Sequence, residues 1–572
     1  MPTYSINPSM SALSLQAALP VVVAAGLLCH FVFKRYEPDS PLSHLGLLVV
    51  VPAVLTTLLL PSASIFMRAF GCVCLLYYST IIVSVVVYRL SPWHPLARYP
   101  GPIPCRISKF WMAWVSRDGK QHQYYSRLHQ TYGDVVRIGP NELSIRDVNA
   151  IAPLMGPNGL PKGPHWDGRM AEQSAIRALI SVRDPVEHSR RRKPWGRAFS
   201  CAALKGYEEI LGKRVQQFVT MLEQQTKPVN LAQCISHFTF DFMSDMAFGG
   251  GSEMLRDGDK DNTWHLLESG LPTALVLSHL PWLGKYYVKL PGIGEDLKKF
   301  RMFCQERAML RRTQGSQSKD LFHYLIDEAG LERHSSPPTF AEVASDGVLA
   351  IVAGSDTTAT TLSSLFWSLL SNPETYLRLQ AEVDRFFPPG EDSLSTVHHP
   401  QMSYLNAVIN ETLRLFPPVL GGSQRGVPIG GDGKFVGPYF LPDGTSAFVH
   451  FYSLHRDPRN FSPSPDTFWP ERWLKPEERA ALSSFDSKGL EKFPIVHDTK
   501  AFIPFSFGPA NCVGKQLACQ EMRTVVCMMM QRLNFSFAEG YDRDSWERDL
   551  KDYFVATKGS LRVVLSPRNP TT

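Results

Sequence analysis

The sequence has 572 residues, of which 44% are hydrophobic and 20% are charged, and its formal net charge is +6 at pH 7. This composition excludes a disordered or fibrous chain, and the diffuse positive charge does not predict a nucleic-acid partner. The ten cysteines are scattered and form no CxxC pair, so a disulfide framework or a structural zinc site is not expected. Unpaired thiols favour a reducing compartment for the main part of the chain.

Three apolar runs occupy the first ninety residues, at 16–33, 45–60 and 70–90. As a helix the first run would cover about 27 Å, close to the thickness of a bilayer core. Residues 1–90 are therefore predicted to be a membrane anchor with up to three transmembrane helices. An interfacial hairpin is the alternative for the second run, which contains Pro52. A cleaved signal peptide followed by core helices is disfavoured, because no basic leader or cleavage site precedes the first run.

Charges beside these runs predict the orientation. Lys34 and Arg35 follow the first run, and Arg89 and Arg98 follow the third. Because cytoplasmic loops favour Lys and Arg, everything after residue 90 is expected to be cytoplasmic. Residues 91–104 contain five prolines and are predicted to be a stiff, extended hinge. Residues 105–572 are then the catalytic domain.

The domain after the hinge reads as helices with a minor share of strands. The stretch 342–371 is a long apolar helix interrupted by a polar patch, Ser355 to Thr358, and a strand is predicted within 445–454. The patch has two interpretations. Its hydroxyls bond back to helix carbonyls and bend the helix, or an acid and an alcohol lie beside a reactive centre that Gly354 allows to approach closely.

A second helix, 404–418, ends at two prolines and carries Glu411 and Arg414 at i, i+3. Such pairs are often solvated, but apolar residues cover most of this helix, so the pair is predicted to be buried. Buried charges need partners, and Arg472 in "PDTFWPERW" is the candidate third member.

The segment "FSFGPANCVGK", 505–515, places Cys512 among glycines and a proline. Both Gly508 and Gly514 are expected to let the backbone wrap the sulfur and aim amides at it, which would lower the basicity of the thiol. The helix that follows would bring its positive end close to the sulfur. A lone metal-binding thiolate in this setting suits the axial position of a haem iron.

With these motifs the sequence resembles the cytochrome P450 family. The motifs occur in the family's order, and the resemblance covers roughly residues 92–566. The matched positions are the haem-ligand loop (Phe505, Gly508, Cys512, Gly514), the E-x-x-R pair (Glu411, Arg414), the segment that carries Arg472, and the A-G-x-D-T-T segment (Ala353, Gly354, Asp356, Thr357, Thr358).

The resemblance implies a mainly α fold with minor β and a haem b group whose axial ligand is Cys512. It implies that Asp356 and Thr357 relay protons to dioxygen. It also implies that His188, Arg192 and Arg425 hold the haem propionates, a role made more demanding because Ala510 stands where many relatives have a basic residue. The positions Val419, Leu420 and Phe554 match substrate-contact regions of the family.

The implied function is a monooxygenase of the endoplasmic reticulum membrane that inserts one oxygen atom from O2 into a lipophilic small molecule, such as a terpenoid or alkaloid secondary metabolite. Electrons would come from NADPH through a separate cytochrome P450 reductase, with cytochrome b5 as a further candidate donor. The charges beside Arg192, in 190–193, are assigned to reductase docking. The alternatives are isomerisation, dehydration or oxidative coupling on the same fold, and a non-catalytic membrane haem-binding protein. The intact acid–alcohol pair favours monooxygenation.

Overall fold

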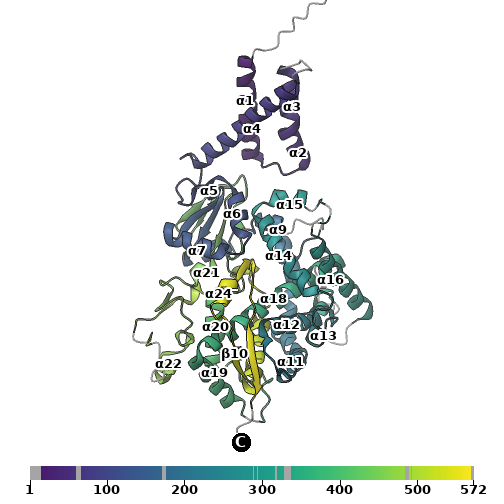
Figure 1. Ribbon diagram of the computed structural model, residues 1–572, viewed down its shortest axis with the longest axis vertical. Helices are drawn as coiled ribbons and strands as arrows, with labels where there is room; N and C mark the ends of the chain where they lie inside the picture. Colours follow the sequence, from purple (N-terminus) through teal and green to yellow (C-terminus); the bar gives the residue numbers. More distant parts are fainter. Residues whose placement is uncertain are drawn as a thin grey trace, which may run out of the picture. The chain divides into compact units, whose positions relative to one another are not determined.

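The computed structural model describes residues 15–59, 66–169, 176–287, 289–290, 292, 294–315, 319–327, 337–388, 390–482, 489–490 and 493–568. The chain divides into two compact units. The first unit comprises residues 1–109 with 137–140, and the second comprises 110–136 and 141–572. Each unit is described by itself below (Figure 1).

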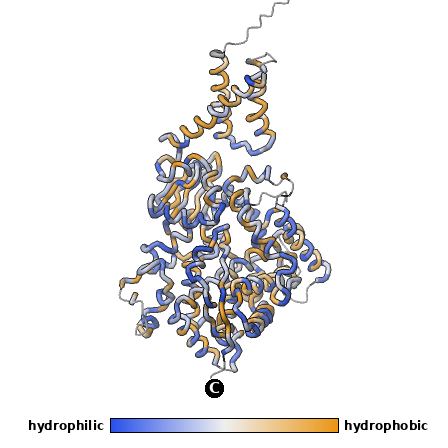
Figure 2. The backbone as a smooth tube through the Cα atoms, in the orientation of Figure 1, coloured by the Kyte–Doolittle hydropathy of each residue, from blue (hydrophilic) through white to orange (hydrophobic). Residues whose placement is uncertain are grey.

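The first unit contains three apolar helical segments, each called a leg here (Figure 2). The first leg is α1 (Leu15–Tyr36) and the third is α4 (Phe66–Leu90). The second leg runs through α2 (Pro41–Leu45), a π-helical turn (Gly46–Val50) and α3 (Val51–Leu59). Both α1 and α3 pack against α4. By length and composition, Ala18–Tyr36, Pro41–Leu58 and Met67–Leu90 could each cross a membrane. These helices are compatible with a membrane anchor. The second run is helical although it contains Pro52. This residue has no backbone N–H to donate, but it lies at the junction between the π-helical turn and α3.

The hinge prediction is wrong in its conformation, because residues 91–99 form a series of tight turns. The amides of His94, Ala97 and Tyr99 donate to the carbonyls three residues before them, at 3.3, 2.8 and 3.2 Å. Helix α5 (Ile103–Ile107) then begins within the stretch predicted to be extended. Proline presets the φ angle of turns as well as of extended chains. The burial of Leu96, which is 1% exposed, accompanies the turns.

The second unit is mainly helical, with its core around one long helix, so the predicted fold class is confirmed. The helix α18 (Phe340–Ser371) packs along α12 (Leu231–Phe248), and α20 (Ser403–Leu415) and α23 (Lys515–Arg532) contact it. The remaining α-helices are α6 (Lys109–Ser116), α7 (Gln121–Tyr132), α8 (Ile151–Met155), α9 (His165–Arg169), α10 (Pro185–Ala198), α11 (Cys201–Glu223), α13 (Met254–Asp257), α14 (Thr263–His279), α15 (Pro281–Tyr287), α16 (Glu295–Gln314), α17 (Leu321–Leu325), α19 (Pro373–Phe386), α21 (Phe451–Leu454), α22 (Pro476–Leu482) and α24 (Ser545–Asp549).

The strands form one four-stranded sheet, in the order β1-β2-β7-β4, and smaller sheets. Strand β2 pairs with β7 in parallel, and β4 pairs with β7 in antiparallel register. A three-stranded sheet has the order β10-β13-β3, and the remaining strands form three antiparallel pairs, β11-β12, β5-β6 and β8-β9. The bounds are β1 (Val135–Gly139), β2 (Glu142–Ile145), β3 (Val229–Asn230), β4 (Arg425–Gly426), β5 (Lys434–Val436), β6 (Tyr439–Leu441), β7 (Ser446–Val449), β8 (Phe461–Ser462), β9 (Val496–His497), β10 (Leu533–Phe537), β11 (Lys551–Tyr553), β12 (Val555–Thr557) and β13 (Arg562–Pro567).

The strand predicted within 445–454 is correct only in its first half. Strand β7 ends at Val449, and the aromatic-rich remainder forms the short helix α21. The ring of His450 bonds the hydroxyl of Ser453 at 2.7 Å, and the amide of Leu454 donates to the His450 carbonyl at 2.9 Å. These local bonds start a helical turn, which the β-favouring composition does not reveal.

Candidate active site

The loop before α23 places Cys512 close to a helix N-terminus. The Cys512 amide donates to the Phe505 carbonyl at 2.9 Å, and a 3-10 turn, Gly508–Ala510, lies between them. Gly508 has φ +74°, and a Cβ there would lie 2.0 Å from the Met155 carbonyl oxygen. Only glycine therefore fits at this position. Helix α23 begins at Lys515, three residues after the cysteine.

Gly514 does not share the conformational requirement of Gly508, contrary to the expectation from sequence. Its φ is −81°, and a Cβ there would make ordinary contacts, 3.6 Å from the Phe199 ring and 4.0 Å from the Cys512 sulfur. Gly514 acts instead through its backbone amide, which lowers the pKa of the Cys512 thiol.

The thiol environment also differs from the expectation. Burial raises the pKa of Cys512, and the Gly514 amide and the Arg192 guanidinium only partly oppose it. The prediction from sequence included the backbone amides that lower the pKa of the thiol, but it left out the burial that raises it. Cys512 nevertheless retains solvent-exposed surface. The result is an accessible sulfur whose pKa is lowered by one backbone amide and by two cations, Arg192 and Lys515, against its burial.

Four basic side chains gather near this loop from three parts of the chain. His188 and Arg192 are one turn apart on α10, Arg425 is on β4, and Lys162 forms an isolated β-bridge with Arg425. Burial first, and then the neighbouring cations, lower the pKa of His188 to about 3 and that of Lys162 to about 7. Burial alone lowers the pKa of Arg425 to about 10. We call these four residues the basic cluster.

The basic cluster has no carboxylate of its own among the described residues. The carboxylate that acts on Lys162 belongs to Asp346, which already accepts from Arg191 at 2.6 Å. The buried Nε of Arg425 has no hydrogen-bond partner in the described part of the chain. Arg192 donates to the carbonyl and side-chain oxygens of Asn511, at 2.9 and 3.1 Å. Uncompensated buried cations of this kind need an anion.

The neighbouring charges of α10 do not form the uniform surface that was assigned to docking. Arg191 is 3% exposed and bonds Asp346, so the docking assignment is wrong for this residue. Arg190 pairs with Glu187 and Glu342. Of the stretch 190–193, only Lys193 is exposed. The spacing of residues along α10 does not predict the burial of Arg191, because Asp346, its ion-pair partner, lies on α18.

Glu411, Arg414 and Arg472 lie together in the core with completely buried side chains. Arg414 donates to both carboxylate oxygens of Glu411 at 2.8 Å, and Arg472 donates to one of them at 3.1 Å. The amide of Trp469 and the indole of Trp473 also donate to Glu411, each at 2.9 Å. These donors lower the pKa of Glu411 to about 2 against its burial. We call Glu411, Arg414 and Arg472 the buried triad.

The polar patch of α18 contains the first of the two arrangements considered from sequence. The Thr357 hydroxyl donates to the Ala353 carbonyl at 2.6 Å, which is the helix back-bond. Asp356 is fully buried, and burial raises its pKa to about 6. Gly354 allows a close approach by Met243 of α12, whose sulfur would lie 2.5 Å from a Cβ, so its contact is with a neighbouring helix.

Comparison with known proteins identifies the family. The protein-family model described as "Cytochrome P450" matches residues 98–560 of this chain. The cytochrome P450 monooxygenase FCK2 of Fusarium pseudograminearum (strain CS3096) is 33% identical over 564 residues, which cover 95% of this chain and 96% of that protein. Cytochrome P450 67 of Uromyces fabae is 31% identical over 564 residues, with 96% and 99% covered. Tryprostatin B 6-hydroxylase of Aspergillus fumigatus is 31% identical over 505 residues, with 86% and 84% covered.

The chain belongs to the cytochrome P450 family. It is thereby an oxidoreductase of a family that uses haem iron, O2 and a redox partner. The residues of this P450 fit a haem: an accessible thiol lies beside a helix N-terminus, and the basic cluster lacks the negative charge that two propionates carry. Lys162 was not found from sequence. Its only signal was a lysine next to glycine in "KGPHW", which does not reveal that it lies opposite Arg425.

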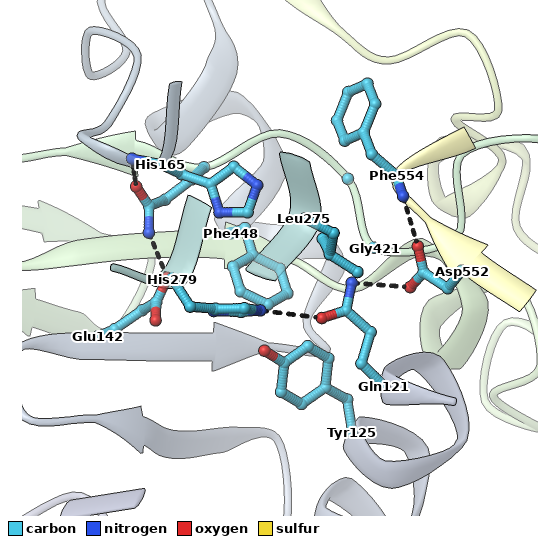
Figure 3. Close-up of a pocket in the computed structure, with 12 residues that line it drawn as sticks. Gln121, Tyr125, Glu142, His165, Leu275, His279, Gly421, Phe448, Asp552 and Phe554 are labelled. Carbon is cyan, nitrogen blue, oxygen red and sulfur yellow. Dashed lines mark hydrogen bonds between the residues drawn. The ribbon is translucent and has the colours of Figure 1, made fainter. Parts of the chain in front are cut away.

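Of the three predicted substrate contacts, the structure places one at a pocket (Figure 3). Phe554 lines this polar pocket of the P450, with its ring 5.2 Å from that of Trp166. Leu420 is fully buried in the core and Val419 is half-buried. The pocket combines amide, carboxyl and imidazole groups with aromatic rings: Gln121, Tyr125, Glu142, His165, Leu275, His279, Gly421, Gly422, Gln424, Phe448, Asp552 and Phe554 line it. Figure 3 shows hydrogen bonds from His279 to Gln121 (3.1 Å) and from Gln121 to Asp552 (3.1 Å).

Proposed function

We propose that this P450 is a membrane-anchored haem-thiolate monooxygenase that inserts one oxygen atom from O2 into a lipophilic small molecule. Electrons come from NADPH through a separate cytochrome P450 reductase, with cytochrome b5 as a further donor. The observation that carries the proposal is the accessible Cys512 thiol, which lies at the start of α23 beside basic groups without counter-charge. The N-terminal helices support anchoring, in the proposal to the endoplasmic reticulum with the catalytic unit in the cytoplasm.

The residues divide the work in this proposal. Haem b, when bound, supplies an iron centre that binds and activates dioxygen. Cys512 would supply the thiolate that holds the iron, and the Gly514 amide would moderate the charge on the sulfur. His188, Arg192, Arg425 and Lys162 hold the propionates. The Thr357 hydroxyl and the Asp356 carboxyl carry protons on the α18 side.

The proposed substrate is a terpenoid, an alkaloid or a similar secondary metabolite. One relative is named for the hydroxylation of tryprostatin B, and it shares 31% identity with this chain. The pocket beside Phe554 combines aromatic rings with hydrogen-bonding groups, but its volume is only about 30 Å³, so it would have to open to admit such a molecule. Phe554 and Val419 are the proposed contacts, whereas Leu420 is fully buried in the core.

The first test is the carbon-monoxide difference spectrum of the reduced, full-length protein. Wild type is expected to show the red-shifted Soret band of thiolate ligation, and Cys512→Ser is expected to lose it completely. Cys519→Ser, which changes a half-buried thiol on α23 just after the loop, is the matched control and should keep the band. A folded, haem-loaded wild type without the band would overturn the proposal.

A further inference from the structure

Asp346, near the start of α18, is a buried carboxylate that ties two other elements to this helix. Its side chain is 3% exposed. The Oδ1 atom accepts from a guanidinium nitrogen of Arg191 at 2.6 Å and from the amide of Leu179 at 2.8 Å. The Oδ2 atom accepts from the indole of Trp195 at 3.2 Å. The long helix is thereby joined to α10 and to the 3-10 turn Leu179–Ser181.

The two donors on α10 fix this helix beside the basic cluster. Arg191 and Trp195 are four residues apart, so they lie on one face of α10. His188 and Arg192 are also four residues apart, on the neighbouring face. Successive helix residues point about 100° apart, so holding the first face fixes the direction of the second. If α10 shifted relative to α18, both of its cluster residues would move with it.

The turn Leu179–Ser181 connects Asp346 to a third member of the basic cluster. The N–H of Leu179 donates to Asp346, and its carbonyl accepts from Nζ of Lys162 at 3.1 Å. The Ile180 carbonyl also accepts from this ammonium, at 2.6 Å. The bond from Asp346 thus anchors the turn whose carbonyls hold Lys162. Three of the four cluster residues are attached to α18 in this way.

Asp346 does not itself neutralise the basic cluster. Its ion-pair partner, Arg191, is a buried cation that needs a counter-charge of its own. Asp346 raises the pKa of Lys162, but by less than burial and the neighbouring cations lower it. Buried cations repel one another, so loosely held side chains would move apart. Firm attachment to α18 keeps them in place, and cations that are already in place bind an anion without the cost of rearrangement.

We propose that Asp346 is a positioning residue for the basic cluster: it holds α10 and the turn Leu179–Ser181 so that the cluster converges on the haem propionates. The carboxylate does not contact the haem and acts through the residues that do. This inference rests on the proposed function.

The test measures how fast two haems leave the full-length protein: haem b and its dimethyl ester, in which the propionates carry no charge. Excess apomyoglobin captures each haem as it is released. Asp346→Asn should release haem b about tenfold faster, because hydrogen bonds to charged groups are weakened. Loss of the ester should change by less than about twofold, because an uncharged ester forms no ion pair with the cluster. A general weakening of the fold would instead accelerate the loss of both haems equally.

Asp241→Asn is the matched control. Asp241 is a fully buried carboxylate on α12. It accepts from the Ser252 hydroxyl at 2.6 Å and from the amides of Met254 and Leu255 at 2.8 and 2.9 Å. These three donors belong neither to α10 nor to the basic cluster. In this variant the ratio of the two rates of haem loss should stay as in wild type, whatever the change in stability.

Asp346→Asn leaves the Arg191 guanidinium buried without its carboxylate, which is costly by itself. The double variant Asp346→Asn/Arg191→Met removes both charges. It should resist urea better than the single variant. It should still release haem b about tenfold faster than wild type, because α10 is no longer held by the ion pair. Normal retention of haem b in the double variant would overturn the inference, because the unpaired charge alone would then explain the single variant.

An equal acceleration for the two haems in Asp346→Asn, or no acceleration, would also overturn the inference. A wild type that takes up haem but lacks the thiolate carbon-monoxide band would overturn the proposed function instead. The comparison of the two haems does not depend on that band, so the two failures are distinguishable.

Discussion

The buried triad and the basic cluster both bring arginine into the protein interior, but they differ in how the charge is balanced. In the triad, Glu411 receives five hydrogen bonds from Arg414, Arg472, Trp469 and Trp473. In the basic cluster, no carboxylate of its own balances the positive charge among the described residues, and the buried Nε of Arg425 has no hydrogen-bond partner there. The triad is complete without a ligand, whereas the cluster is complete only with an anion. The first arrangement serves the fold, and we propose that the second serves a cofactor.

The largest expected effect follows from breaking the triad. Glu411→Gln keeps the shape of the side chain but leaves two buried arginines without their carboxylate. Removing one partner of a buried ion pair costs about 3–5 kcal/mol. The free energy of unfolding should fall by this amount in urea denaturation, and the yield of haem-loaded protein should fall with it.

Glu209→Gln is the matched control for this variant. Glu209 also pairs with a basic residue along a helix, Lys213 at 2.6 Å, but both side chains are more than 70% exposed. Water and salt screen such a pair, so the free energy of unfolding should stay unchanged. Equal losses for the two variants would mean that burial does not distinguish the triad.

A smaller and different effect is expected from the basic cluster. Arg425→Met removes a buried cation, so haem-free protein should be no less stable than wild type. Haem affinity should fall about 10- to 100-fold, because hydrogen bonds to charged groups contribute roughly 1.5–3 kcal/mol. Haem loss to an apomyoglobin acceptor measures the affinity, and urea denaturation of the haem-free chain measures the stability.

The contrast would be lost if Arg425→Met destabilised the haem-free protein as strongly as Glu411→Gln does. Arg562→Met, at an exposed position on β13, controls for the loss of one positive charge. It should leave both haem retention and the unfolding curve as in wild type.

The two clusters also differ in how far sequence could predict them. Glu411 and Arg414 share one helix with an apolar surface, so spacing and neighbours were enough to predict that they are buried. Lys162 and Arg425 come together through a β-bridge between distant segments, and Lys558 reaches Asp356 from the end of a hairpin. No periodicity or spacing within a single sequence predicts that residues of such distant segments meet. The motif residues were therefore predictable, and the partners that adjust their charge were not.

Conformation was less predictable than element type for a related reason. The helix through 342–371 was predicted because its pattern persists over many residues. The prolines of 91–104 suit both turns and an extended chain, and the hydrogen bonds of His94, Ala97 and Tyr99 show that turns form. Likewise, two glycines flank Cys512, but only Gly508 requires a left-handed backbone.

The smallest expected effect near neutral pH is a pH dependence that the basic cluster should show and the buried triad should not, because the pKa of Glu411 is lowered to about 2. The pKa of Lys162 is about 7 in the folded, haem-free chain, well below the usual value near 10.5. Between these values the unfolded chain binds a proton that the folded chain does not, so stability from this group rises with pH. The rise should be about 1 kcal/mol per pH unit above pH 7. Below pH 7 both states are protonated and the dependence disappears.

Lys162→Met should remove this rise, so the difference in unfolding free energy between wild type and variant is the quantity to follow from pH 6 upward. Haem supplies the negative charge that the cluster lacks, and a nearby anion raises the pKa of a lysine. The rise should therefore shift to higher pH in haem-loaded wild type. Identical pH profiles with and without haem would mean that Lys162 does not face the propionates, and the basic cluster would then reduce to His188, Arg192 and Arg425.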